Sequence, residues 1–320
     1  MTDKIVTIHE LAKAAGVSIA SISRALNGKP GISDKLRQRI VDLSEELNYQ
    51  PNTMARRLIV GNKAVVALSM PPEPHEFSER PYFVHFYQAM TLHLHTKGLV
   101  PVLFKYDQLD AIPSQACAAV LLGATIDDRP QRLRELNIPF VGLELDAEYS
   151  VTIDNQDAIC KLSQYLIEQG RTKLVFLGED NDANYSSARA LGYQQAMAEA
   201  GLKSQMQHLH RESSATMNAY RHVMALAKQQ GLDNDAFVCS NDEIALGVVT
   251  ALKDLGIDVP TQIAVTGFDD LPKISSHLTT VHQDLTRIAE SVVELLQDSI
   301  EGRNPRSVCV PTSLKFRDSA

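Results

Sequence analysis

From Ala64 onward, short apolar runs alternate with longer amphipathic stretches, and this alternation most limits the folds open to the chain. The runs of strand length are residues 64–70, 100–105, 118–123, 140–145, 174–178, 237–240 and 263–267. The stretches with helical spacing are residues 84–96, 155–169, 187–200, 217–230, 242–255 and 285–300. Uninterrupted apolar strands joined through helices indicate parallel sheets buried on both faces, and roughly 260 residues suit two such lobes. Ligands of these folds bind at the carboxyl ends of strands, which favours a site between the lobes.

Residues 6–28 have a different pattern, that of two short helices joined by a turn. Thr7 can N-cap the first helix, with Glu10 as the reciprocal partner of a capping box. Gly16 ends that helix, because glycine adopts positive φ freely, and Ser18 can N-cap the second. One inner face then collects the apolar positions Ile8, Leu11, Ala12, Ala15, Ile22, Ala25 and Leu26. The pattern is typical of a helix-turn-helix, whose second helix enters the DNA major groove, although an ordinary helical hairpin has the same spacing.

A third helix is predicted next, followed by a short basic stretch. Ser33 caps this helix, which runs to about Leu47 with Ile40 and Leu43 inward, and residues 48–52 break it. Residues 53–61, TMARRLIVG, are too few to form a stable helix alone. They are either a plain linker or a helix that orders only on a partner.

Charge is distributed unevenly along the chain. The protein has a formal net charge of −8, from 31 Lys and Arg against 39 Asp and Glu. Residues 1–61 hold nine of the basic and six of the acidic side chains, a balance of +3 that leaves −11 for the remainder. A basic head on an acidic body indicates a head that meets nucleic-acid phosphate and a body that does not.

Several other classes of protein are disfavoured. The cysteines Cys117, Cys160, Cys239 and Cys309 have no metal-like spacing and indicate buried thiols in a reduced cytoplasm. The N-terminus lacks the apolar segment of a signal peptide, and no run approaches the ~20 apolar residues of a membrane span, so we expect a cytoplasmic protein without a membrane partner. Nucleophile elbows, phosphate loops, zinc motifs and Rossmann glycine triplets are missing from the sequence, so we expect neither an enzyme nor a cofactor or metal ion.

Five motifs together make the chain similar to transcriptional regulators of the LacI/GalR family. They are TIHELAKAAGVSIASISRALNG, LNYQPNTMARRL, SARALGY (187–193), SNDEIALG (240–247) and VTGFDD (265–270), in the family's order and spacing. The resemblance implies a helix-turn-helix headpiece at 1–50, a hinge helix or linker at 51–62, and a core at 63–320 similar to periplasmic binding proteins. It also implies three crossings between lobes, near residues 155, 283 and 314. The N-lobe would comprise about 63–155 and 284–313, and the C-lobe about 156–282 and 314–320.

The resemblance also places the contacts with DNA. Ile19 and Ala20 occupy the family's main base-reading positions, and Arg24 occupies that of an arginine, whose guanidinium can bond guanine bidentately. Leu58 matches a hinge leucine that wedges into a central minor-groove step and kinks the duplex. Packing inside the head is the alternative role for Ile19. The expected DNA-binding residues are Thr7, Ser18, Ile19, Ala20, Ser21, Ser23, Arg24, Asn27, Asn52, Arg56 and Leu58.

Effector contacts carry over in the same way. The expected effector-binding residues are Ser69, Glu144, Tyr185, Arg189, Asn241 and Asp269. A planar donor, an amide and carboxylates suit a polyhydroxylated ligand, because each hydroxyl both donates and accepts a hydrogen bond. Structural roles compete at some positions: Asn241 or Asp242 could simply cap the helix that starts there, Arg189 could form a plain salt bridge, and Asp270 is interpreted as structural.

Departures from the family leave the ligand's identity open. The stretch HRESSATMNAY holds small side chains where the family often has an aromatic that stacks on the ligand, and Tyr185 could supply that face instead. Ala183 and Asn184 stand where purine-responsive members carry an additional arginine, which argues against a nucleobase. The loop MPPEPHEFSERPYF holds three side chains that either reach the cleft or decorate its rim, namely His75, Phe77 and Arg80.

The function implied by the resemblance is repression of a carbohydrate-utilisation operon. A homodimer would bind a pseudo-palindromic operator and respond to a sugar or sugar derivative, with induction favoured over corepression. The leucine-rich tetramerisation helix of longer members is not found after Phe316, which favours a dimer. A nucleoside-responsive or ligand-independent DNA-binding regulator is the alternative within the fold. A transport-type binding protein is opposed by the basic head, and a hydrolase would require Glu144 and Asp269 to act as a catalytic pair.

Overall fold

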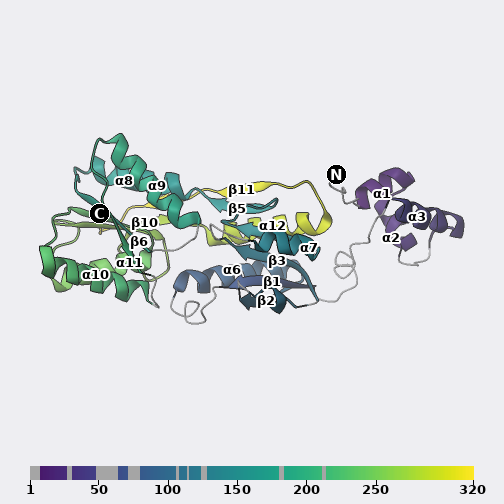
Figure 1. Cartoon of the computed structure of the whole chain (residues 1–320), viewed down its shortest axis with the longest axis horizontal. Helices are drawn as coiled ribbons and strands as arrows, with labels where there is room; N and C mark the ends of the chain where they lie inside the picture. The colour runs from purple at the N-terminus through teal and green to yellow at the C-terminus, as the bar shows by residue number, and fades with distance from the viewer. Residues whose placement is uncertain are drawn as a thin grey trace. The chain divides into compact units, whose positions relative to one another are not determined.

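The computed structural model describes residues 8–26, 31–47, 64–70, 80–105, 108–113, 115–123, 128–179, 184–210 and 214–320. The chain divides into two compact units, residues 1–62 and 63–320. Figure 1 shows the described helices and strands of both units.

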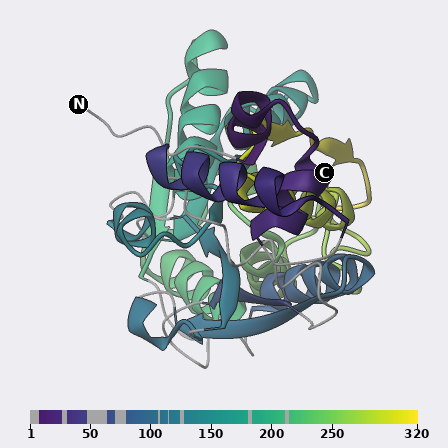
Figure 2. The same ribbon diagram turned by 90° about the vertical axis from the view of Figure 1, so that its right-hand side faces the viewer.

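In its described residues, 8–26 and 31–47, the first unit contains the helices α1 (Ile8–Ala15), α2 (Ile19–Leu26) and α3 (Asp34–Glu46). Figure 2 looks onto these purple helices. Gly16 has φ +69° in the turn between α1 and α2, which confirms the predicted stop. The Ser18 hydroxyl accepts a hydrogen bond from the Ser21 amide at 3.2 Å, and Ser33 caps α3 through the Leu36 amide at 3.3 Å. The buried core of the unit consists of Leu11, Ala12, Ala15, Ile22, Ala25 and Ile40.

The first sheet of the second unit is parallel throughout and has the strand order β11-β5-β4-β3-β1-β2. Its strands are β1 (Ala64–Met70), β2 (Leu99–Lys105), β3 (Ala116–Leu122), β4 (Phe140–Leu143), β5 (Ser150–Ile153) and β11 (Ser307–Val310). The accompanying helices are α6 (Pro81–Thr96), the 3-10 turn η1 (Leu109–Ala111), α7 (Arg129–Glu135) and α12 (Leu285–Glu301). Helix α12 packs against α6 and against strands β3, β4 and β5.

The second sheet has the order β12-β10-β9-β8-β6-β7, with only β12 antiparallel to its neighbour. Its strands are β6 (Leu174–Glu179), β7 (Met206–Leu209), β8 (Ala236–Cys239), β9 (Ala264–Asp269), β10 (Thr279–His282) and β12 (Ser313–Lys315). Its helices are α8 (Asn155–Glu168), α9 (Asn184–Glu199), α10 (Ala215–Gln230) and α11 (Asp242–Asp254).

Strand β6 shows why the central strands of these sheets are apolar at successive positions and do not alternate between polar and apolar residues. Its side chains point to opposite faces in turn, and both faces are covered by helices. Val175 and Leu177 belong to the apolar cluster under α10 and α11, whereas Leu174 and Phe176 belong to the cluster under α8 and α9. The two doubly wound parallel α/β sheets predicted from the sequence are therefore confirmed.

The chain passes between the two lobes three times, after β5, after β10 and after β11. Because all strands except β12 run parallel within each sheet, their carboxyl ends lie at one edge. In the second lobe this edge carries Glu179 at the end of β6, Ser240 after β8 and Asp269 at the end of β9. The connections between lobes carry Asn155 and Gln283 to the same region, as the hydrogen bonds described below show.

Candidate functional site

The start of α2 presents an exposed surface. Ser18, Ile19, Ala20 and Arg24 are exposed, whereas Ile22 is fully buried in the core of the unit. Ile19 is 39% exposed, so its side chain is not one of the buried packing residues of the head. Three of these exposed residues, Ile19, Ala20 and Arg24, are the predicted base-reading residues.

Two other residues of α2, Ser21 and Ser23, are half-buried. The end of α2 is held by α3, because the Arg37 guanidinium donates to the carbonyl oxygens of Arg24 and Ala25, each at 3.3 Å. The remaining predicted DNA contacts lie outside the described residues, namely Thr7, Asn27, Asn52, Arg56 and Leu58.

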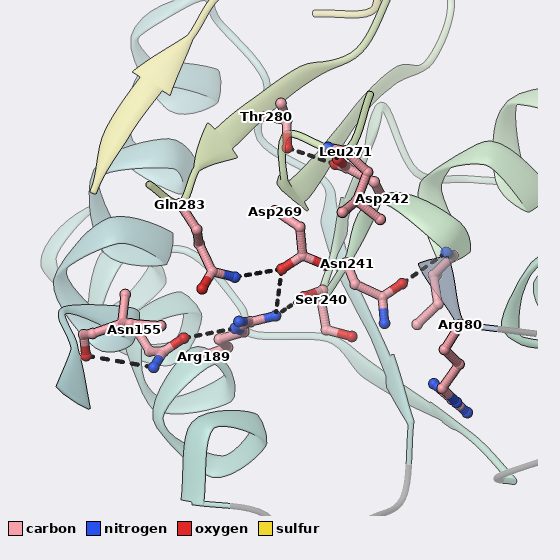
Figure 3. A network of polar contacts seen from close by, with 12 residues as sticks. Arg80, Asn155, Arg189, Ser240, Asn241, Asp242, Asp269, Leu271, Thr280 and Gln283 are labelled. Carbon is pink, nitrogen blue, oxygen red and sulfur yellow. Dashed lines mark hydrogen bonds and ion pairs between the residues drawn. The ribbon is translucent and has the colours of Figure 1, made fainter. Parts of the chain in front are cut away.

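Arg189, on α9, is the centre of a buried polar network in the second unit (Figure 3). Its Nε donates to Asn155 Oδ1 at 2.8 Å, and one terminal nitrogen donates to the Ser240 carbonyl at 2.7 Å. The same terminal nitrogen lies 3.7 Å from Asp269 Oδ1. These contacts bring together the end of β9, the turn after β8 and the connection into α8. The predicted residues Arg189 and Asp269 therefore meet.

Aromatic rings cover the Arg189 guanidinium. Its carbon lies 3.6 Å from the ring centroid of Phe268 and 5.1 Å from that of Tyr185. Cation–π contacts of this kind hold a planar guanidinium in one orientation. The half-buried Tyr185 ring is thus engaged by Arg189 rather than simply presented as a stacking face.

Asp269 has a second partner that sequence reasoning missed. Gln283 Nε2 donates to Asp269 Oδ1 at 2.5 Å, and both side chains are buried (Figure 3). Asp269 sits at φ +113°, a strained conformation for a non-glycine residue. Burial raises the pKa of the Asp269 carboxyl, while the positive charge of Arg189 acts in the opposite direction.

Glu144 lies just after β4 at φ +55° and is half-buried. Its Oε1 accepts a hydrogen bond from the Ile153 amide at 2.7 Å. Burial raises the pKa of Glu144, and the hydrogen bonds from Ile153 and Asn155 and the charge of Arg189 partly offset that rise. Asn155 thereby connects Glu144 of the first lobe to the Arg189 network.

Asn241 has the capping role that the sequence left open, whereas Asp242 bonds to residues outside α11. Asn241 Oδ1 caps α11 by accepting from the Ile244 amide at 2.8 Å. Asp242 is fully buried and accepts from Thr280 Oγ1 at 2.6 Å and from the Leu271 amide at 2.8 Å. A Cβ at Gly267 would lie 2.2 Å from Asp242 Oδ1, so glycine makes room for this carboxylate. Burial and the charge of Asp269 raise the pKa of Asp242.

Ser69, predicted to bind the effector, and Asp270, predicted to be structural, both have partners within the fold. Ser69 is buried at the end of β1, where its hydroxyl accepts from the Leu122 amide at 3.1 Å and its carbonyl accepts from the Tyr87 hydroxyl at 2.5 Å. Asp270 contacts Arg317 at 2.7 Å, which agrees with its interpretation as structural.

Arg80, at the start of α6, is bonded to the second lobe. Its two terminal nitrogens donate to the two carboxylate oxygens of Glu179 at 2.7 and 2.8 Å, and both side chains are buried. Burial alone would lower the pKa of Arg80, but the hydrogen bonds and charge of Glu179 raise it. Of the three loop residues considered from the sequence, Arg80 therefore reaches across the lobes. His75 and Phe77 lie outside the described residues.

Tyr82 and Glu243 are two further residues near the Arg189 network that the sequence analysis did not identify, and Tyr82 is described first. The Tyr82 ring stacks on Phe86 with centroids 6.3 Å apart. Burial raises the pKa of the Tyr82 hydroxyl, and the charges of Asp269 and Glu144 add to that effect. The sequence signal for this position was Pro81, because proline favours the first turn of a helix and so indicates that α6 begins before Tyr82.

We use "polar cluster" for the residues Arg80, Tyr82, Glu144, Asn155, Glu179, Arg189, Asn241, Glu243, Asp269 and Gln283.

Two family models match the chain. Residues 7–52 match bacterial regulatory proteins of the lacI family, and residues 163–320 match a periplasmic binding protein-like domain. The chain is a LacI-family transcriptional regulator. It is accordingly a DNA-binding protein with a ligand-binding core, and it belongs to a family without enzymatic activity.

Curated relatives align with nearly the whole regulator. The uncharacterised HTH-type transcriptional regulator YvdE of Bacillus subtilis is 29% identical over 297 residues, covering 91% of each chain. The HTH-type transcriptional repressor PurR of Erwinia tasmaniensis is 26% identical over 338 residues, covering 98% of the regulator and 97% of PurR. The HTH-type transcriptional regulator MalR of Clostridium butyricum is 26% identical over 336 residues, covering 98% of each.

Solved structures share the fold. A complex of the transcriptional regulator CelR with cellobiose has a TM-score of 0.72 and 24% identity, covering 98% of the regulator and 100% of CelR. A Lac repressor dimer bound to operator and the anti-inducer ONPF has a TM-score of 0.71 and 21% identity, covering 99% of each chain. In the described ranges, no helix is long and apolar enough to cross a lipid bilayer.

Proposed function

We propose that the regulator is a cytoplasmic repressor of a carbohydrate-utilisation operon and that a sugar or sugar derivative controls its operator affinity. The observation that carries this proposal is the polar cluster around Arg189, which combines a fixed guanidinium with carboxylate and amide groups. Such a set matches ligands whose hydroxyls both donate and accept. The solved complex of CelR with cellobiose supports the same ligand class.

The proposed DNA-binding device is a homodimer with two headpieces on a pseudo-palindromic operator. The exposed start of α2 supports base reading by Ile19, Ala20 and Arg24, with the serines directed to phosphate. We propose headpiece boundaries at 1–50, a hinge at 51–62 whose Leu58 enters the minor groove, and the core boundaries given above. The Lac repressor dimer solved on its operator supports this arrangement.

The proposed effector set keeps Arg189, Asp269, Glu144, Asn241 and Tyr185 as residues around the ligand. Asn241 Oδ1 is engaged in capping α11, so the Asn241 amide nitrogen is the group we assign to the ligand. Ser69 stays in the proposed set at the end of β1, where its hydroxyl and its carbonyl oxygen each already accept one hydrogen bond within the fold. Ligand binding between the lobes would change their separation and hence the placement of the hinges. The ligand can shift operator affinity only by its differential affinity for the two states, typically ~1–3 kcal/mol.

The test uses the full chain and an operator selected from random duplexes. Operator affinity is measured with and without each member of a panel of sugars and sugar phosphates, after a thermal-shift screen has chosen saturating concentrations. We expect one sugar to raise the melting temperature and to weaken operator binding several-fold. A stabilising sugar that leaves operator affinity unchanged, or binding of the dimer to all duplexes alike, would contradict the proposal.

A further inference from the structure

Four buried side-chain atoms in the described part of the chain have no hydrogen-bond partner, and three of them belong to the polar cluster. They are Nε of Arg80, Oε1 of Glu243 and Oε1 of Gln283, and each residue is at most 6% exposed. A buried polar atom without a partner is destabilising because it has lost its hydrogen bonds to water, and more so when it is charged. Their gathering in one region indicates that a ligand supplies the missing bonds, namely one acceptor and two donors.

Glu243 is the member whose charge is not balanced. It is the second residue of α11 and is 5% exposed. The cation that acts on it is Arg80, but both terminal nitrogens of Arg80 are already bonded to Glu179. Arg189, the other buried cation of the cluster, faces Asp269. The carboxylates of Glu179, Asp269 and Glu243 thus face only two arginines, so one negative charge is left unbalanced even before Glu144 is counted.

The electrostatic surroundings of Glu243 confirm this excess. Burial, with smaller contributions from the charges of Glu179 and Asp242 and against the opposing charge of Arg80, raises the pKa of Glu243 from 4.5 to about 7. An acidic residue in the first turn of a helix is favourable in itself, because it faces the positive end of the helix dipole. An exposed side chain would provide that benefit without burial, so the dipole does not explain why Glu243 is 5% exposed.

We propose that the effector of this regulator carries a protonated amine that donates to Glu243, and that the effector is an amino sugar. This inference rests on the proposed function, in which a sugar derivative binds at the polar cluster. The amine balances the excess carboxylate with a charge-assisted hydrogen bond, which is about twice as strong as a neutral one. A sugar hydroxyl donates to Gln283 Oε1, and a sugar oxygen accepts from Arg80 Nε.

The experiment compares matched ligands on the full chain. Isothermal titration near neutral pH is performed with glucosamine, galactosamine and mannosamine and with their parents glucose, galactose and mannose. Within each pair only the ammonium and the hydroxyl at one carbon differ. We expect at least one amino sugar to bind about tenfold or more tightly than its parent, the size of one charge-assisted hydrogen bond.

Glu243→Gln then tests whether Glu243 is responsible. This variant keeps the shape of the side chain but removes its charge, so we expect the preference for the amino sugar to disappear while the parent hexose binds unchanged or better. Glu199→Gln, at an exposed carboxylate of α9 in the same lobe, is the matched control and should keep the preference. Thermal unfolding without ligand verifies that Glu243→Gln folds, and we expect it to be at least as stable as the parent chain.

The outcomes separate the inference from the proposed function. If a neutral hexose binds and shifts operator affinity while the amino sugars bind no better, the inference is overturned and the proposed function stands. If an amino sugar binds preferentially and Glu243→Gln keeps that preference, the assignment to Glu243 is overturned. If no sugar of either kind binds, both the inference and the sugar effector are overturned.

Discussion

The guanidinium of Arg80 and the carboxylate of Glu179 form a bidentate ion pair that joins the two lobes of the core, with both side chains buried. Arg80 stands at the start of α6 in the first lobe, and Glu179 ends β6 in the second. Opening of the lobes would have to separate the pair and hydrate both charges. The pair is therefore placed where it can bias the equilibrium between open and closed lobes.

A double-mutant cycle measures this coupling. We expect Arg80→Met to lower the free energy of unfolding of the core by about 3–5 kcal/mol, because Glu179 would remain buried without its cation. Adding Glu179→Leu to Arg80→Met should recover most of that loss. Urea unfolding of the two single variants and the double variant gives the coupling energy. Additive losses in the double variant would show that the pair contributes no coupling.

Asp242→Asn should change how stability depends on pH. Because burial raises the pKa of Asp242 above its ordinary value of 3.8, the folded state binds the proton more tightly than the unfolded state does. Stability from this group is therefore greatest in acid and falls as pH rises above 3.8 through the raised pKa of the folded state. Asn can accept from the Leu271 amide and donate to Thr280, so the variant should gain stability relative to the parent chain at neutral and alkaline pH.

The measurement is urea unfolding of both chains at a series of pH values. Asp254→Asn, at an exposed carboxylate of α11 that accepts a hydrogen bond from the Tyr220 hydroxyl at 3.0 Å, serves as the comparison for the loss of one charge on the same helix. Parallel stability curves for Asp242→Asn and the parent chain would contradict the predicted proton linkage.

Arg24→Ala should relax the choice of base at one guanine of the operator and cost about 1–3 kcal/mol at that position, because a bidentate pair is lost. Arg56→Ala should instead weaken binding to all sequences and flatten the salt dependence, as a lost phosphate contact does. Binding to a set of single-base operator variants at several salt concentrations distinguishes the two. Equal weakening of every site by Arg24→Ala would mean that Arg24 contacts only phosphate.

Asp269→Asn should reduce the response to the effector while operator binding without effector is kept. Asn is a better substitution than Ala at this position, because Asp269 also accepts a hydrogen bond from Gln283 and faces the buried Arg189. Both substitutions remove the carboxylate, but Asn retains one acceptor and nearly the same volume, whereas Ala would leave Arg189 and Gln283 without any side-chain acceptor at this position. Calorimetry with the effector and operator binding with and without it provide the readout. Unchanged ligand affinity in Asp269→Asn would remove Asp269 from the site.

The sequence predicted the central strands well because they are apolar without interruption. Strand β1 occupies residues 64–70 as predicted, and the five other central runs were placed within two residues. The strands that were missed are three or four residues long and lie at or next to the sheet edges. They are β5, β7, β10, β11 and β12, and the polar helix α7 was missed as well. A longer uninterrupted apolar run leaves a clear signal in sequence, whereas a strand of three or four residues does not.

The candidate site was only partly predictable, for a different reason. Arg189 and Asp269 were placed by motif and do lie together. Their partners Asn155 and Gln283 come from connections between the lobes that the sequence pattern does not distinguish from ordinary turns. The pairing of Arg80 with Glu179 joins positions 99 residues apart, and local periodicity says nothing about such a contact. The pairing of the charged side chains could therefore be identified only from the folded structure.

The last strands of the two sheets have a consequence for the order of synthesis and folding. Strands β11 and β12 lie within nine residues of each other, yet each adds to a different sheet. During translation, a chain whose residues 307–315 are still inside the ribosome already exposes most of both lobes, but β5 and β10 each have one paired edge and one open edge. An open strand edge is a template for pairing with other chains. Ribosome-bound intermediates of this regulator should therefore remain prone to association until residues 307–315 emerge, when β11 and β12 cover both edges almost at once.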